Sequence, residues 1–125
     1  MTAARRATGE KAEDLVAARL AAAGWEILER NARTRYGELD IVARDGPALV
    51  FVEVKAGRAG TGFGPERPVL AVDARKQRRV RRLAVAWMAE RRGVRPYSQI
   101  RFDAVGVTFD RAGRVTDVEH IPAAF

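Results

Sequence analysis

The chain of 125 residues is long enough for one domain with a buried core, but it leaves no room for a second recognition module. It lacks cysteine, which excludes disulfides and zinc–thiolate sites, and no apolar run approaches the about 18 residues of a membrane span. Its formal net charge of +7 equals that of residues 73–95 alone, where nine basic side chains accompany two acidic ones. Such a concentrated basic segment favours a polyanion, most commonly nucleic acid, as the partner. Because no apolar stretch follows Arg5 and Arg6, we expect no secretory signal and a cytoplasmic protein.

The first element is expected to be a helix from about Gly9 to Ala23, with Thr8 as its N-cap and Gly24 in the position that follows its last turn. The residues before Thr8 are expected to be frayed. Apolar side chains recur at helical spacing and predict a buried stripe that consists of Ala12, Leu15, Val16, Leu20 and Ala23. Glu13 lies at the flank of this stripe, and its spacing alone favours a solvated acid there.

Residues 25–31 predict the first strand, and residues 33–35 predict the turn that leads out of it. The arginines of this turn, Arg33 and Arg35, either contact phosphate or are solvated, and the sequence leaves both alternatives open. Two further strands follow at residues 37–43 and 48–55. They are joined by a turn and predict a β-hairpin.

This hairpin is expected to bring acids and a lysine together. Strand side chains alternate between faces, so Glu53 and Lys55 project from one side, while Val50, Val52 and Val54 project into an apolar layer on the other. A symmetric turn centred between residues 46 and 47 places Asp40 directly opposite Glu53, with about 5 Å between the Cβ atoms. The same register places Glu38 opposite Lys55.

Asp40 and Glu53 predict a metal site. Two carboxylates at this distance repel each other unless a cation lies between them, and hard oxygen ligands suit Mg²⁺ or Mn²⁺. Lys55 could then hold or deprotonate an attacking water, or stabilise charge that develops on a phosphate. An isolated Glu-x-Lys is usually a pair of solvated charges, but residues 50–52 are apolar on both faces, as in a central strand, where terminal charges need a reason. The three side chains are the minimum apparatus for metal-dependent phosphodiester hydrolysis.

Residues 56–68 are too rich in glycine and proline for regular structure and predict a loop, either a flap that orders on substrate or a flexible linker. Asp73 then predicts the N-cap of a helix that extends to about Arg92 and is ended by Gly93. Helical spacing separates an apolar face from an arginine face: Val80, Leu83, Ala84 and Trp87 on the first, Arg75, Arg78, Arg79 and Arg82 on the second. Charge runs are usually solvated, but one without interleaved acids repels itself, which favours phosphate binding.

The remaining chain predicts a strand at residues 98–109, a turn at residues 110–113 and a last strand at residues 114–121. We expect Asp103 to be the structural partner of an arginine rather than a metal ligand, and His120 to be a surface residue rather than a catalyst. The element order α-β-β-β-α-β-β indicates an α/β fold, a three-layer α/β/α arrangement around a mixed sheet.

Two segments carry a resemblance to a known family, namely GELDIVA at residues 37–43 and FVEVK at residues 51–55. The chain resembles the YraN-like family, small bacterial proteins grouped with the PD-(D/E)xK restriction-endonuclease-like nucleases and similar to archaeal Holliday-junction resolvases. Further matches fall at the other motifs of that family, at residues 10–13, 27–31, 63–64, 71–73, 76–77 and 101–103.

The resemblance implies a role for each matching residue. It makes Asp40 and Glu53 metal ligands and Lys55 the catalytic lysine. It also makes Glu13 an accessory acid that reaches the site from the first helix, and Gln77 a polar residue that faces the site from the second. The dipeptide at residues 56–57 replaces the Thr-Arg that often follows the lysine in the family, a departure that affects a nearby phosphate contact rather than the central residues.

Together these observations lead to the hypothesis that residues 1–125 form a single restriction-endonuclease-like nuclease domain that cuts DNA with Mg²⁺ or Mn²⁺. Its DNA backbone contacts would come from six arginines: Arg35, Arg58, Arg75, Arg78, Arg79 and Arg82. Because the chain lacks elements that read base edges, we expect a preference for branched or single-stranded DNA, as in repair or recombination. The alternative is a nucleic-acid-binding or scaffolding protein that does not cut, and whether the protein forms a homodimer stays open.

Overall fold

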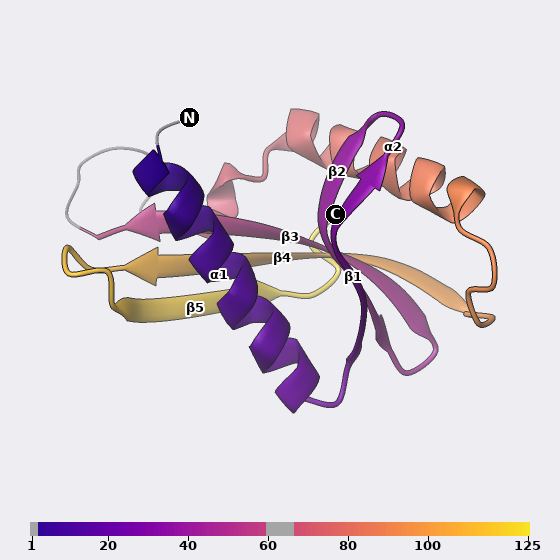
Figure 1. Cartoon of the computed structure of the whole chain (residues 1–125), viewed down its shortest axis with the longest axis horizontal. Helices are drawn as coiled ribbons and strands as arrows, with labels where there is room; N and C mark the ends of the chain where they lie inside the picture. The colour runs from indigo at the N-terminus through magenta and orange to yellow at the C-terminus, as the bar shows by residue number, and fades with distance from the viewer. Residues whose placement is uncertain (1–2, 60–66) are drawn as a thin grey trace.

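A computed structural model describes residues 3–59 and 67–125. The elements are α1 (Ala3–Ala22), β1 (Glu26–Thr34), β2 (Gly37–Asp45), β3 (Ala48–Arg58), the short 3-10 helix η1 (Pro68–Ala71), α2 (Ala74–Glu90), β4 (Gln99–Phe109) and β5 (Val115–Ile121). The order predicted from the sequence is therefore confirmed (Figure 1). No helix in these described ranges is long and apolar enough to cross a membrane.

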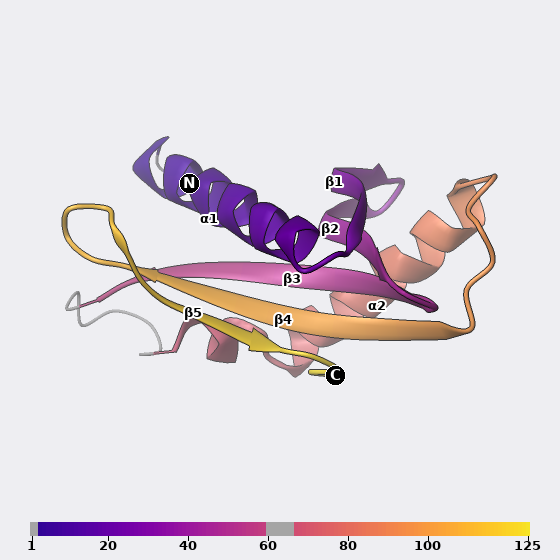
Figure 2. The same cartoon turned by 90° about the horizontal axis from the view of Figure 1, so that it is seen from below.

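The five strands form one sheet in the order β1-β2-β3-β4-β5. Only β3 and β4 are parallel, because the connection through α2 returns the chain in the same direction, and the other neighbours are antiparallel. The helix α1 packs on one face with Val50, Val52 and Val54 of β3, while α2 packs with Leu49 and Phe51 on the other. The predicted three-layer α/β/α arrangement with a mixed sheet is thus confirmed (Figure 2).

Helix α1 begins earlier than its sequence predicted. Its first residue is Ala3 rather than Gly9, so Thr8 lies inside the helix and the predicted N-cap is wrong. Residues 3–7 are alanine and arginine, both good helix formers, and they extend the helix through a threonine and a glycine that would otherwise start it. Thr8 instead accepts a hydrogen bond from Arg58 Nη2, at 3.4 Å.

The buried stripe and the end of α1 are close to their predictions. Ala12, Val16 and Leu20 are buried, and Leu15 is half-buried, but the predicted burial of Ala23 is wrong because that residue lies beyond the last helical turn and is exposed. Gly24 takes a left-handed φ of +93° after the helix, as expected for the residue that ends it.

Strand β1 continues beyond the seven residues predicted for it. It pairs with β2 from Glu26 opposite Arg44 to Thr34 opposite Gly37, so Arg33 and Thr34 belong to the strand and only residues 35–36 form the turn. The predicted turn at residues 33–35 is therefore shifted, because the cross-strand ladder holds β1 in place to its last pair.

The predicted register of the hairpin formed by β2 and β3 is correct near its turn. The pairs run from Asp45 opposite Ala48 to Ile41 opposite Val52, but the ladder stops one pair short of Asp40 and Glu53. Beyond this point β2 pairs with β1 alone, and β3 continues beside β4. The two strands separate, and Figure 1 shows the β1–β2 end leaving the rest of the sheet.

Strand β3 extends three residues into the segment predicted to be a loop. Residues 56–58 pair with residues 107–109 of β4, so the expectation of irregular structure fails there. Parallel pairing with a strand far along the chain overrides the local glycine content. Residues 60–66, where most of the predicted flap or linker and the matched residues 63–64 fall, lie outside the described residues.

Helix α2 has the predicted cap and faces. The Asp73 carboxylate accepts a hydrogen bond from the Lys76 amide at 3.0 Å, and the last helical residue is Glu90, two residues before the predicted end. All four predicted apolar residues are buried, and all four predicted arginines are exposed. Trp87 packs edge-on against Phe51, with 5.8 Å between ring centroids.

Asp103 is fully buried in β4 and organises the β4–β5 edge. Arg101 Nε donates to it at 2.9 Å, His120 Nε2 lies 2.8 Å from it, and the Ala123 amide donates at 3.0 Å. Burial alone would raise the pKa of this carboxyl, but the hydrogen bonds from its partners hold the pKa below its usual value. The expected arginine partner is confirmed, and His120 lies on the exposed edge strand.

Gly106→Ala should destabilise the fold. A Cβ added to Gly106 would lie 2.6 Å from the backbone nitrogen of Val69, so η1 would have to shift away from β4. We expect a loss of about 1–3 kcal/mol in the free energy of unfolding, measured by urea denaturation. Gly9→Ala is the control, since its Cβ would meet no atom within 4 Å, and removing a helical glycine should add about 1 kcal/mol. If Gly106→Ala were as stable as the wild-type protein, the close packing of η1 against β4 would be contradicted.

Candidate functional site

The candidate site lies where β2 and β3 separate. Asp40 comes one residue after the last β2–β3 pair, and its Oδ2 accepts a hydrogen bond from the Val54 backbone amide at 2.8 Å. A side-chain carboxylate thus replaces the backbone carbonyl that a continued ladder would supply. Because a buried N–H without an acceptor is costly, this contact fixes Asp40 at the opening between the strands.

Glu53 and Lys55 lie on the same side of β3, as strand alternation predicted. Lys55 Nζ is 3.3 Å from Glu53 Oε1, and the two side chains are 29% and 15% exposed. Within this ion pair, the lysine side chain is therefore more exposed to solvent than the glutamate side chain. An ammonium in that position is available to a group that approaches from solvent.

Glu13 reaches the same cluster from α1. Its carboxyl group lies within hydrogen-bonding reach of Asp40 and feels the charge of Glu53. Burial is the largest cause that raises the pKa of Glu13, and the charge of Glu53 adds to it, whereas the hydrogen bond with Asp40 and the charge of Arg30 lower that pKa. The sequence spacing alone favoured a solvated acid at this position, whereas the structure brings Glu13 to Asp40 as the family resemblance implied.

The carboxyl groups of the cluster hold their protons more tightly than usual. Burial is the main cause that raises the pKa of Asp40 to about 6, and the charge of Glu13 adds to it. Burial and the charge of Asp40 raise the pKa of Glu53 to about 7, against the opposing effect of Lys55. Near neutral pH the cluster therefore accommodates its negative charge poorly without a bound proton or cation.

The donor set fits a hard divalent cation held by few protein ligands. Within residues 3–59 and 67–125, no group of three or more His, Cys, Asp or Glu side chains is arranged to hold a metal ion. Mg²⁺ commonly uses only one or two carboxylates and completes its shell with water and substrate phosphate. Asp40 and Glu53 satisfy that requirement by their chemistry.

Two residues predicted beside this cluster have other partners. Glu38 was expected opposite Lys55, but this is wrong, because β2 pairs with β1 there and Glu38 contacts Arg33 at 3.1 Å. Gln77 donates a hydrogen bond from Nε2 to the Val72 carbonyl at 3.1 Å, which supports the start of α2. In the described part of the chain no hydrogen bond joins Gln77 to the cluster, and its role in the site stays a prediction.

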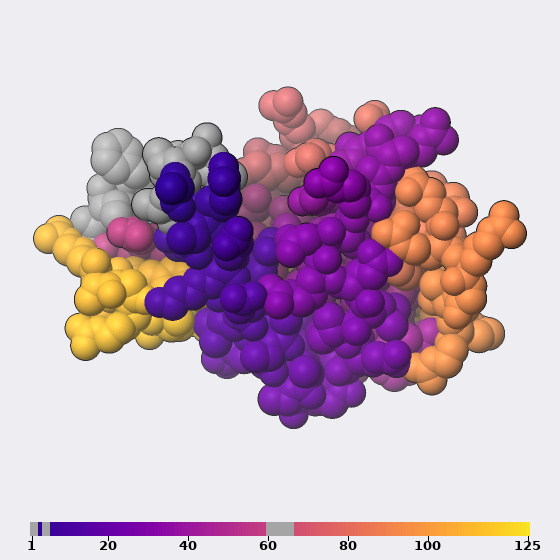
Figure 3. All heavy atoms as spheres, in the orientation of Figure 1, coloured from indigo at the N-terminus to yellow at the C-terminus, as the bar shows by residue number. Residues whose placement is uncertain are grey.

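The predicted phosphate-binding arginines lie on exposed surfaces. Among the described residues, no ion pair engages the four arginines on α2, namely Arg75, Arg78, Arg79 and Arg82. Arg79 lies against the β1–β2 turn, since a Cβ added to Gly37 would be 3.2 Å from its Nη2. Figure 3 shows α2 and the tip of this hairpin at the same edge of the molecule. The arginine face of α2 thus adjoins the strand that carries Asp40.

Sequence reasoning missed two features of this region. It did not identify the Val54 amide as the partner of Asp40, because a backbone donor leaves no signal in the sequence. It also passed over Tyr36, which stands 55% exposed at the tip of the β1–β2 hairpin with the Arg35 guanidinium over its ring. The sequence signal that could have identified Tyr36 is an aromatic residue in a short basic turn, directly after Arg35 and before Gly37.

The fold and the site together define a small α/β protein with a carboxylate and lysine cluster at a break in its sheet. The chain belongs to the uncharacterised protein family UPF0102, whose model matches residues 12–107 and so includes the whole cluster and α2. It is 47% identical over 121 residues to a UPF0102 protein of Nocardia farcinica, across 97% of this chain and 91% of the relative. A UPF0102 protein of Geobacter metallireducens is 43% identical over 125 residues, across 100% and 97% of the two chains.

Replacing the central carboxyls by amides should stabilise the metal-free protein at alkaline pH. The pKa values of Asp40 and Glu53 in the folded state, about 6 and about 7, exceed the ordinary 3.8 and 4.5. Stability from these groups is therefore fully present below about pH 4 and is lost as the pH rises through 6 and 7. In EDTA, Asp40→Asn with Glu53→Gln should raise the free energy of unfolding at pH 8, and the gain should vanish towards pH 4.

Urea denaturation across this pH range measures the effect. Glu38→Gln is the matched control, because that carboxylate is exposed on the same strand and should not reproduce the pH-dependent gain. A gain of equal size at pH 4 and pH 8 would show that ionisation of the buried carboxyls is not its origin.

Proposed function

We propose that this protein is a Mg²⁺- or Mn²⁺-dependent DNA endonuclease. The observation that carries the proposal is the cluster at the β2–β3 separation, where the Asp40, Glu53 and Glu13 carboxyls resist ionisation and the half-buried Lys55 lies beside Glu53. Perturbed acids beside a lysine are typical of catalytic sites rather than of ordinary surfaces. The resemblance to PD-(D/E)xK nucleases supports the same function.

Asp40 and Glu53 would hold the metal ion, which supplies charge neutralisation at the scissile phosphate and lowers the pKa of an attacking water. The Val54 amide keeps the Asp40 carboxylate oriented, and Glu53 keeps the Lys55 ammonium within 3.3 Å. Lys55 would then donate hydrogen bonds to the attacking water or to a phosphate oxygen as the water oxygen bonds to phosphorus and the P–O bond to the leaving oxygen breaks. The proton that the attacking water loses would pass to solvent, and the leaving oxygen would take a proton from solvent. When ionised, Glu13 would add negative charge that attracts the cation to the cluster.

The arginine face of α2 would hold the nucleic-acid backbone. Phosphate contacts position a strand without reading its sequence, and the four arginines there have no competing acid partner among the described residues. The sheet and its two helices use most of the chain, which leaves few elements that can enter the major groove. We therefore propose that specificity comes from DNA shape, with branched, flapped or single-strand-containing DNA cut in preference to plain duplex.

A rival function is nucleic-acid binding or scaffolding without cleavage. The observation that favours it is the arginine face of α2, because its four exposed arginines can contact phosphates without a metal ion. Both functions require salt-sensitive binding, so only metal-dependent strand cleavage separates them.

Cleavage should depend on the cluster and on metal. Glu53→Gln and Lys55→Met should each reduce the cleavage rate by at least about 100-fold while DNA binding persists, because the first removes a ligand of the metal ion and the second removes an ammonium that stabilises charge at the reacting phosphate. The assay compares a four-way junction, a flap, a single strand and a duplex of matched sequence with Mg²⁺ and Mn²⁺. Cleavage that persists in EDTA, or full activity of Glu53→Gln, would refute the proposal.

Metal binding can be checked apart from activity. Mg²⁺ should raise the melting temperature of the wild-type protein at pH 8, because it relieves repulsion in the cluster. The variant with both Asp40→Asn and Glu53→Gln should not respond. Glu38→Gln, with an altered charge outside the cluster, should respond like the wild type.

The arginine face should contribute salt-dependent binding. Arg78→Ala and Arg82→Ala should each weaken binding to all DNA sequences alike and reduce the slope of log affinity against log salt by about 0.9 on duplex DNA, because each phosphate contact releases a counterion. Fluorescence anisotropy in EDTA at several salt concentrations measures the slope. Arg111→Ala, an exposed arginine in the β4–β5 turn, should leave it unchanged. Equal slopes for all these variants would assign the α2 face to solvent.

A further inference from the structure

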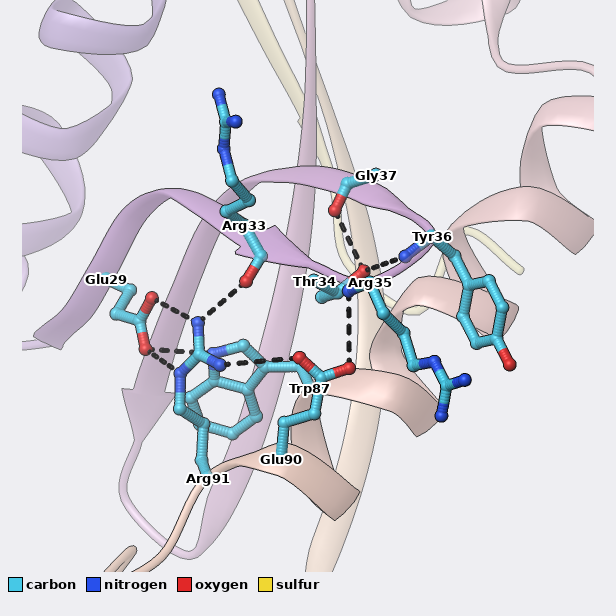
Figure 4. A network of polar contacts seen from close by, with 9 residues as sticks. All are labelled: Glu29, Arg33, Thr34, Arg35, Tyr36, Gly37, Trp87, Glu90 and Arg91. Atoms are coloured by element: carbon cyan, nitrogen blue, oxygen red, sulfur yellow. Dashed lines mark hydrogen bonds and ion pairs between the residues drawn. The ribbon is translucent and has the colours of Figure 1, made fainter.

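The tip of the β1–β2 hairpin is internally braced. Thr34 Oγ1 donates a hydrogen bond to the Gly37 carbonyl at 2.8 Å and accepts one from the Tyr36 amide at 3.1 Å. The hydroxyl therefore ties both sides of the two-residue turn together, and Thr34 is itself buried. Figure 4 shows these contacts at the centre of a larger polar network.

The same tip is anchored to the end of α2. The Arg35 amide donates to Glu90 Oε2 at 3.3 Å, and Arg91 Nη2 donates to the Arg33 carbonyl at 3.0 Å. Arg91 is held in turn by Glu29 of β1, with Nη2 donating to Oε2 at 2.9 Å. Glu29 lies in β1, Glu90 is the last residue of α2 and Arg91 directly follows it, so these contacts tie the turn to the end of α2 (Figure 4).

This fixed turn presents an aromatic side chain to solvent. Tyr36 is 55% exposed, and the Arg35 guanidinium lies 5.1 Å from the centre of its ring. In Figure 4 both side chains extend away from the cluster formed by Glu29, Trp87 and Arg91. An exposed ring on a braced turn loses little conformational freedom on binding, which suits a stacking contact.

The position of Tyr36 relates it to both parts of the proposed nuclease site. Arg79 of the arginine face lies against the neighbouring Gly37. Tyr36 directly precedes β2 and is four residues before Asp40, a separation of about 13 Å along extended backbone.

We propose that Tyr36, supported by Arg35, stacks on an unpaired base of the DNA that the arginine face holds. Proteins that bind single strands combine a basic surface with aromatic side chains, because every base offers a face for stacking. In an intact duplex the bases are already stacked on each other, so the ring gains nothing there. This inference rests on the proposed function and names its substrate class, which is DNA with unpaired nucleotides near the cut.

The test measures binding in EDTA, so cleavage plays no part in it. Fluorescence anisotropy compares a duplex that contains a short single-stranded gap with the same duplex intact. Tyr36→Ala should weaken binding to the gapped DNA by about 5- to 150-fold and leave duplex binding nearly unchanged, whereas Tyr36→Phe should bind both like the wild type. Val115→Ala is the control, since Val115 is also exposed, at 42%, but lies on β5.

A fluorescent base locates the contact. 2-Aminopurine placed in the gap should be quenched by the wild-type protein and by Tyr36→Phe but not by Tyr36→Ala. If Tyr36→Ala weakens gapped and intact DNA equally, or if neither DNA binds the wild type, the stacking role is overturned. Absence of cleavage with Mg²⁺ and Mn²⁺, together with gap-specific binding that depends on Tyr36, would refute the nuclease while the stacking role stands.

Discussion

The hydrogen bond from the Val54 amide to the Asp40 carboxylate is the contact on which the rest of the site depends. It occurs where β2 leaves β3 to follow β1, a point at which the sheet would otherwise leave a backbone donor without a partner. An acid is the side chain that can bridge the gap, but it places a charge among buried groups. The separation of β2 from β3 therefore accounts both for the break in the sheet and for the raised pKa values of the cluster.

The same separation of strands needs a second support at its far end. Once the β1–β2 hairpin leaves the sheet, no third strand in the described part of the chain pairs with its tip, and the contacts of Glu29 and Arg91 join it to the end of α2 instead. The hairpin thus lies between the acidic cluster at its base and the arginine face of α2 beside its tip. Such a surface suits a polyanion, because the arginines can bind its phosphates beside an acidic cluster that can bind a cation.

Local patterns predicted the parts of this arrangement that depend on neighbours in sequence. The symmetric turn at residues 46–47 gave the register of β2 and β3, and helical spacing gave both faces of α2. The predictions were wrong where pairing between strands that are distant in sequence determines the structure. Glu38 faces Arg33 because β1 competes for β2, and β3 runs to Arg58 because β4 pairs with it from more than 40 residues away. Neither competition leaves a periodic signal.

The raised pKa values of Asp40 and Glu53 also link the two proposed ligands. A phosphate that approaches Asp40 and Glu53 adds negative charge, which favours their protonated forms, whereas a divalent cation favours the ionised forms. Metal and nucleic acid would therefore bind better together than apart, since the cation would remove the repulsion between the carboxylates and the phosphate, and the phosphate would supply oxygen ligands to the cation. Because coupling between sites is reciprocal, DNA would tighten metal binding by the same factor by which metal tightens DNA binding. A cluster of readily ionised surface carboxylates would show a weaker coupling, so burial at the break in the sheet is what joins substrate binding to assembly of the proposed metal site.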